Sequence, residues 1–252
     1  MQSCCSEDNA PSPDTRPADQ TAHSSSGNQA AAVDSTLAGR YFAQAAQFQN
    51  AARFDSARVY LQKAIPLFEK EEKWEQLVRS LNALAGVYRT IRQLGPAHET
   101  LTKALQLGTE RLDGDNPVVA ATHQEFGIIY AIMGQISRAQ AEFGQALTLF
   151  KKTLGENDPN VANVYNNLGN LSVISGEFDR ALEHYEKALA IKRQAFGEND
   201  PRVADAYFAL GQAHRNKGYL DESLTLSQKA LDIFFATIGE NDPKVARLYM
   251  SF

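Results

Sequence analysis

A short motif that returns every 42 residues constrains this chain more than any other feature. The pentapeptide Gly-Glu-Asn-Asp-Pro occupies residues 155–159, 197–201 and 239–243, and a weaker copy, Gly-Asp-Asn-Pro, occupies 114–117. A fixed period of this size is typical of a solenoid, in which each unit buries its apolar side only against its neighbours. Solenoids usually present an extended surface to a partner rather than an enclosed pocket.

The unit 159–196 shows how one period is expected to fold. Asp158 is placed to cap a helix, and Pro159 suits the first helical position, where its missing N–H is not needed. Apolar residues then recur at three- and four-residue spacing, which indicates an amphipathic helix. Gly176 is expected to end it, Asp179 to cap a second helix, and Gly197 to end the unit. The unit is therefore predicted to be a helical hairpin.

The other periods repeat this pattern, and the predicted fold is an all-α solenoid of antiparallel helix pairs. Equivalent glycines and caps of the second helix are Gly134, Gly218, Ser137 and Asp221, while Gly95-Pro96 is expected to place proline at a first helical position. An earlier unit aligns with an offset of 40 residues. About five pairs and one terminal helix are expected, in units 36–74, 75–116, 117–158, 159–200, 201–242 and 243–252. Residues 1–35 are polar and proline-rich, which predicts a disordered tail.

Small and aromatic residues at fixed places in each unit resemble the tetratricopeptide repeat. Small residues stand where the two helices of a pair should cross, and aromatic residues recur in both helices; they are Gly127, Ala139, Ala146, Gly169, Ala181, Ala188, Gly211, Ala230, Tyr88, Tyr130, Phe143 and Tyr185. The 42-residue length and residues 161–169, Val-Ala-Asn-Val-Tyr-Asn-Asn-Leu-Gly, are similar to the repeats of kinesin light chains. Aspartate replaces that family's histidine before proline, and no heptad coiled coil precedes the repeats. The resemblance implies a right-handed superhelix, and not the identity of a kinesin light chain.

The resemblance also implies a binding surface, because the first helix of each pair lines the concave side of such a superhelix. The residues at the groove-facing positions include Asn82, Arg89, Gln124, Asn163, Asn166, Asn170, Phe208, Gln212 and Arg215. Asparagine and glutamine carry both donors and acceptors, so a row of them can bond to the backbone of an extended peptide. Arg89, Arg215 and Phe208 are expected to add selectivity. The alternative interpretation of this row is a solvated polar helix face.

Composition and motifs argue against the other classes of function. The net charge is −5 and the basic residues are dispersed, so no nucleic-acid partner is expected. No metal-ligand spacing, phosphate loop or nucleophile–base pair is found, so no cofactor and no enzyme activity are predicted. The function expected is a non-enzymatic protein-interaction scaffold that takes a peptide or protein segment in its groove. The alternative is a sensory or regulatory input module of a larger signalling protein.

The two ends of the chain carry expectations about location and assembly. No apolar stretch is long enough for a transmembrane helix, and without a hydrophobic leader a cytoplasmic location is expected. Cys4, before a polar tail, is similar to the lipidated cysteine of a bacterial envelope lipoprotein, which is the alternative if the natural start lies upstream. The last helix has few residues, and self-association through the C-terminal end is a further expectation.

Overall fold

The computed structural model describes residues 36–240 and 242–249, and within them every regular element is an α-helix. The predicted tail and Cys4 lie outside these residues. The helices are α1 (Leu37–Asn50), α2 (Phe54–Lys70), α3 (Trp74–Thr90), α4 (Leu94–Arg111), α5 (Pro117–Ile132), α6 (Ile136–Leu154), α7 (Pro159–Ile174), α8 (Phe178–Phe196), α9 (Pro201–Lys217), α10 (Leu220–Ile238) and α11 (Pro243–Tyr249).

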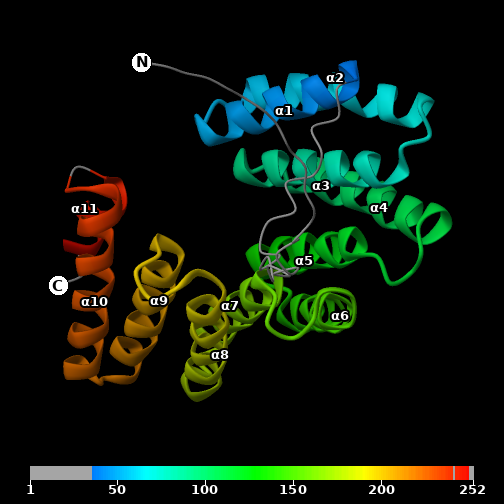
Figure 1. Cartoon of the computed structure of the whole chain (residues 1–252). Helices are drawn as coiled ribbons and strands as arrows, with labels where there is room; N and C mark the ends of the chain where they lie inside the picture. The colour runs from blue at the N-terminus through cyan, green and yellow to red at the C-terminus, as the bar shows by residue number, and fades with distance from the viewer. Residues whose placement is uncertain (1–35, 241, 250–252) are drawn as a thin grey trace, which may run out of the picture. The chain divides into compact units, whose positions relative to one another are not determined.

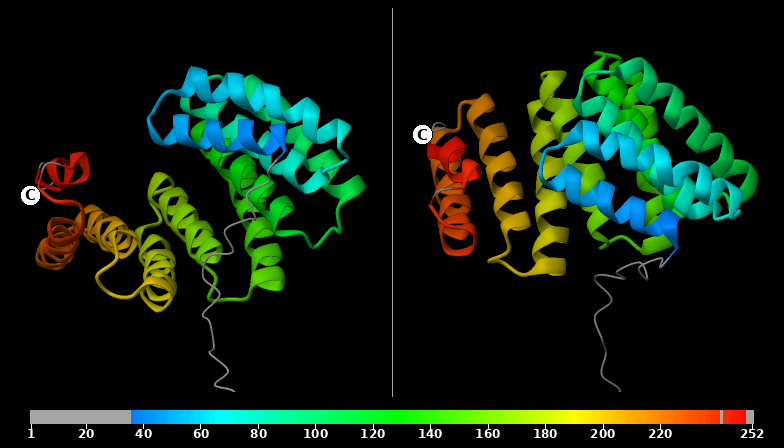
Figure 2. Two further views of the ribbon diagram at one scale, coloured as in Figure 1. Left: turned by 45° about the horizontal axis from the view of Figure 1, so that its top comes forward. Right: turned by 90° about the horizontal axis from the view of Figure 1, so that it is seen from above.

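The helices pack in consecutive pairs, from α1 with α2 to α9 with α10, and each pair contacts the next along the chain (Figures 1 and 2). The odd-numbered helices α1 to α9 are the A helices and the even-numbered helices α2 to α10 are the B helices. The described residues all belong to one structural unit. This is the predicted all-α solenoid of helix pairs.

The apolar core is built between neighbours, as a repeat array requires. Phe143 and Phe150 of α6, for example, pack with Val161 and Val164 of α7, and all four are almost fully buried. Each pair therefore completes the core of the previous one. The apolar periodicity of the sequence is explained by these contacts.

The caps predicted for the later A helices are confirmed. The Asp158 carboxylate accepts a hydrogen bond from the Asn160 N–H, and Asp200 does the same for Arg202; both prolines follow at the first position. Asn116 caps α5 in the same way. These side chains bond backbone donors that the first helical turn leaves unpaired. The repeated pentapeptide thus connects one unit to the next.

The caps predicted for the B helices are wrong. The helix α8 begins at Phe178, so Asp179 is its second residue, and Glu177 at the cap position makes no side-chain bond. Ser137 and Asp221 are likewise second residues of α6 and α10. The reason is the turn: Gly176 takes a positive φ of 74°, and the chain re-enters a helix directly after it. Backbone bonds already close the end of α7.

The two earliest turns within pairs achieve the same geometry without glycine. Ala52 and Arg92 have φ values of 54° and 63° at the places that Gly134, Gly176 and Gly218 occupy later. Pro96 is the third residue of α4, not the first as predicted, because that helix begins at Leu94. The first two units therefore keep the fold with less favourable turn residues.

Close contacts at the helix crossings confirm the need for small residues there. A Cβ atom added at Gly127 would lie 2.5 Å from Cδ1 of Phe143, and one at Gly169 would lie 2.6 Å from Cε1 of Tyr185. Both rings are almost fully buried. Alanines 139, 146, 181, 188 and 230 are completely buried at the other crossing positions.

Candidate functional site

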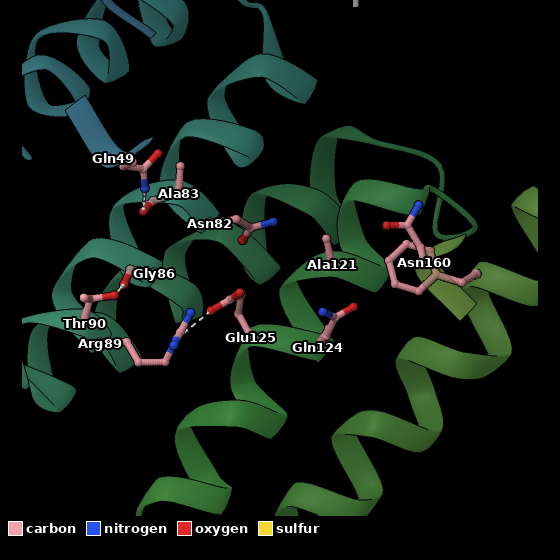
Figure 3. A pocket seen from close by; sticks show the side chains of 11 residues that line it. Gln49, Asn82, Ala83, Gly86, Arg89, Thr90, Ala121, Gln124, Glu125 and Asn160 are labelled. Atoms are coloured by element: carbon pink, nitrogen blue, oxygen red, sulfur yellow. Dashed lines mark hydrogen bonds and ion pairs between the residues drawn. The ribbon is translucent and has the colours of Figure 1, made fainter. Parts of the chain in front are cut away.

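A cavity of about 380 Å³ opens on the side of the A helices, between α1, α3, α5 and α7. Seven of its eleven lining residues have polar side chains, and Figure 3 shows side chains from separate helices directed toward a common space. The lining residues are Gln49, Asn82, Ala83, Gly86, Arg89, Thr90, Ala121, Gln124, Glu125, Phe150 and Asn160. We call this space, together with the faces of α7 and α9 that the repeat makes equivalent to it, the groove.

The structure brings together three of the residues proposed from the sequence. Asn82 and Arg89 of α3 face Gln124 of α5 across the cavity (Figure 3). The other six lie on α7 and α9, outside the cavity. Among them Asn163, Asn170 and Arg215 are exposed, and Asn166, Phe208 and Gln212 are partly buried.

Two of the proposed asparagines already have bonds within the protein. The Asn82 amide donates to the Val118 carbonyl at 3.2 Å, and its oxygen accepts from the Thr122 hydroxyl at 2.9 Å. The Asn170 oxygen accepts from the Tyr185 hydroxyl at 2.6 Å. Asn82 therefore joins α3 to α5, and it retains one N–H and one acceptor lone pair for a ligand.

An ion pair crosses the cavity between neighbouring A helices. Arg89 Nε lies 3.2 Å from Glu125 Oε2, and a Cβ added at Gly86 would contact both side chains at 3.9–4.0 Å. Burial raises the pKa of the Glu125 carboxyl, and Arg89 opposes this rise. The absence of a side chain at Gly86 leaves the pair accessible from the cavity. The Arg89 guanidinium, a donor, and the Glu125 carboxylate, an acceptor, are thus both available to a ligand in the cavity.

Sequence reasoning missed Gln49, Thr90, Glu125 and Asn160. Gln49 donates to the Ala83 carbonyl at 3.5 Å and occupies in α1 the place that Arg89 has in α3. Extending the 40-residue offset to the first A helix would have identified it. Glu125 follows Gln124 directly, and only the approach of α3 shows that its side chain reaches the groove.

The chemistry of this site is hydrogen bonding and charge pairing. Among the described residues no group of three or more His, Cys, Asp and Glu side chains is placed to hold a metal ion. In the same part of the chain no helix combines the length and the apolar character that crossing a bilayer requires. Gln124, Asn163 and Asn166 make no side-chain hydrogen bond within the described residues. Their amide groups are therefore available to a ligand.

Comparison with known proteins identifies the repeat. The sequence model of the family described as tetratricopeptide repeat matches residues 118–194 and 160–234. No curated protein matches the sequence significantly. Among solved structures, BtubC (BKLC) from P. vanneervenii is 22% identical, with a TM-score of 0.60 over 82% of this chain and 94% of that one.

Two further structures share the arrangement of helices. A putative kinesin light chain from Podosopora anserina with nearly identical TPR-like repeats is 21% identical, with a TM-score of 0.60 over 79% of this chain and 95% of that one. The Rap conjugation gene regulator of the plasmid pLS20, in complex with the Phr* peptide, is 17% identical, with a TM-score of 0.70. That match covers 85% of this chain and 58% of the regulator. At these identities the likeness concerns the fold.

Proposed function

This chain is a tetratricopeptide-repeat protein with repeats like those of kinesin light chains, and from that premise we propose that it is a non-enzymatic scaffold binding an extended peptide segment along the groove. The observation that carries the proposal is the polar cavity, to which α1, α3, α5 and α7 all contribute. Its side chains offer donors and acceptors at intervals set by the spacing of the helices.

The spacing of the A helices suits an extended backbone. Packed helices lie about 8–10 Å apart, and an extended chain advances about 3.3 Å per residue, so each repeat spans about three peptide residues. Gln124 on α5 and Asn166 on α7 occupy equivalent places and can bond peptide groups at this interval. Such bonds to the backbone tolerate many peptide sequences.

Charged groups would add selectivity at the first part of the groove. The Arg89 guanidinium and the Glu125 carboxylate are adjacent, so they favour a ligand that presents complementary charge or two neighbouring polar groups. The peptide complex of the Rap regulator supports the proposal, since a protein of the same fold holds a peptide.

The proposal is tested by closing the cavity without disturbing the helices. A display library of random peptides would be selected on the wild-type protein, and the affinities of selected peptides measured by calorimetry. In the Gly86→Leu variant the added side chain enters the cavity, and we expect binding to fall by at least about tenfold.

The matched control is Gly144→Leu. Gly144 is also an interior helical glycine, it is exposed on α6, and a Cβ there meets nothing within 4 Å. Both variants should keep the wild-type circular dichroism spectrum. Equal affinities of the two variants for the selected peptides would refute binding in this cavity.

The alternative, an input module of a larger signalling protein, uses the same groove and differs in what the bound peptide controls. We keep the input module as a second candidate because this chain shares its fold with a gene regulator bound to a peptide. Its test is whether a peptide that binds wild type, but not Gly86→Leu, changes the activity of an attached domain. No change on saturation would leave the scaffold as the better proposal.

A further inference from the structure

One lysine breaks the repeat at a position that is otherwise apolar. The residues near the ends of α2, α6 and α10 that pack against the following unit are Phe68, Phe150 and Phe234, each 1–3% exposed. The equivalent residue of α8 is Lys192, which is 9% exposed. The fourth B helix therefore packs the stem of a lysine where α2, α6 and α10 bury a ring, and the Lys192 ammonium keeps some contact with solvent. Gly108 fills the same place in α4 and needs no charge compensation.

Lys192 has no hydrogen bond or ion pair within residues 36–240 and 242–249. Asp205 is the carboxylate that acts on it, but Lys244 Nζ already lies 2.8 Å from Asp205 Oδ2. Arg202 stands nearby with the same sign of charge and is itself bonded twice to Asp200. Burial, together with Lys244 and Arg202, lowers the pKa of the Lys192 ammonium.

The repeat places Lys192 beside the groove. Phe150, its equivalent one unit earlier, lines the cavity together with Ala121 and Gln124. One unit later the residues equivalent to Ala121 and Gln124 are Asn163 and Asn166. By this equivalence we expect the next segment of the groove to combine asparagine amides with a lysine, where the first segment has a ring and an alanine.

We infer that Lys192 is a subsite of the groove for a carboxylate side chain of the bound segment. The inference rests on the proposed function and specifies one residue class of its ligand, aspartate or glutamate. The Lys192 ammonium is partly desolvated and has no hydrogen-bond partner within the described residues, so a ligand carboxylate that reaches it would form a charge-assisted hydrogen bond. Asn163 and Asn166 would hold the backbone on either side of that residue.

A lysine with only a structural role predicts different behaviour. If only the packing of its methylene stem matters, methionine would replace it with no effect on ligands. In our assignment the charge itself is used. Removing it should stabilise the free protein and weaken acidic ligands, two effects of opposite sign that a packing role does not produce.

The test is selection from the random-peptide display library on wild type and on Lys192→Met. We expect the wild-type peptides to be enriched in aspartate or glutamate at one position, and this enrichment to disappear in the variant. Replacing that residue of a selected peptide by its amide should weaken binding to wild type by about tenfold or more, but leave Lys192→Met unchanged.

Three further proteins make the outcome decisive. Lys192→Arg should retain the acidic preference, and Lys187→Met, the same change at an exposed site of α8, should leave it intact. Lys192→Phe should unfold at a higher urea concentration than wild type. Peptides that bind without acidic preference, or equally to Lys192→Met, would overturn the subsite alone. Failure of wild type to select any peptide that Gly86→Leu loses would overturn the proposed function.

Discussion

Replacing Gly127 by alanine tests the close packing of the helix pairs. The new Cβ would lie 2.5 Å from two atoms of the Phe143 ring, a distance that real Cβ atoms do not show. Alanine in place of glycine within a helix contributes about 1 kcal/mol of stability, but overfilling a packed core costs about 1–3 kcal/mol. Because Phe143 is only 1% exposed, its ring has little room to move. We expect a net loss of up to about 2 kcal/mol.

The chain itself supplies the compensating change. At the equivalent crossing of α3 and α4 an alanine, Ala85, faces a smaller side chain, Leu101, and both are completely buried. Gly127 and Phe143 fill their crossing with a smaller residue on the A helix and a larger one on the B helix. Gly127→Ala together with Phe143→Leu should therefore recover most of the stability lost in the single variant.

Urea unfolding followed by circular dichroism measures these effects. Gly86→Ala is the control, since its Cβ meets no atom closer than 3.9 Å and only the helix-propensity gain of about 1 kcal/mol remains. Repeat arrays can lose two-state behaviour, so midpoints are compared as well as slopes. If Gly127→Ala unfolds at the wild-type midpoint or above it, the ring moves freely and the packing argument is wrong.

Three other predictions follow from the turns and the groove. Asp158→Ala should lower the free energy of unfolding by about 1 kcal/mol through loss of a cap, whereas Asp179→Ala should change the thermal midpoint far less; equal shifts would contradict the assigned helix starts. Arg92→Gly should raise stability by about 1 kcal/mol, because its φ of 63° strains any side chain; an unchanged or lower midpoint would refute this. Burial raises the Glu125 pKa, so the folded protein binds its proton at a higher pH than the unfolded chain does, and wild type should lose stability relative to Glu125→Gln as pH rises above the ordinary value of 4.5. Urea titrations of both proteins between about pH 4 and 7 measure this difference, and a constant difference would contradict it.

The fold was predictable because its determinants are local and repeated. Asp158 and Pro159 specify a helix start by bonding and backbone geometry within three residues. The period also indicates that Gly127 lies where the two helices of a pair cross, so a small residue is needed there. The starts of the B helices were not predictable in the same way. Asp179 is a good capping residue by type, but the turn at Gly176 closes with backbone bonds and leaves the carboxylate beside Lys217.

Part of the lining of the cavity was predictable from the sequence, and the contacts of its side chains were not. The repeat indicates which side of α3 and α5 should carry the groove, and Arg89 and Gln124 do line a cavity there. The repeat does not indicate the hydrogen-bond or ion-pair partner of each side chain, because that partner belongs to another unit. Asn82 bonds to α5, and Glu125 approaches Arg89 only once α3 and α5 have packed. Contacts between units are set by three-dimensional packing, which the period of one unit does not describe.

A repeat array provides internal controls, since residues at equivalent positions of different units can be compared directly. The exchange of Ala85 and Leu101 for Gly127 and Phe143 keeps the volume of the crossing, so it is explained by packing alone. The exchange of phenylalanine for Lys192 has only a partial partner change: Asp205 stands one period after Asn163 and acts on Lys192, but its carboxylate is already paired with Lys244. A substitution that lowers stability without local compensation is better explained by binding than by folding. Lys192 is therefore a position where binding explains the residue better than packing does.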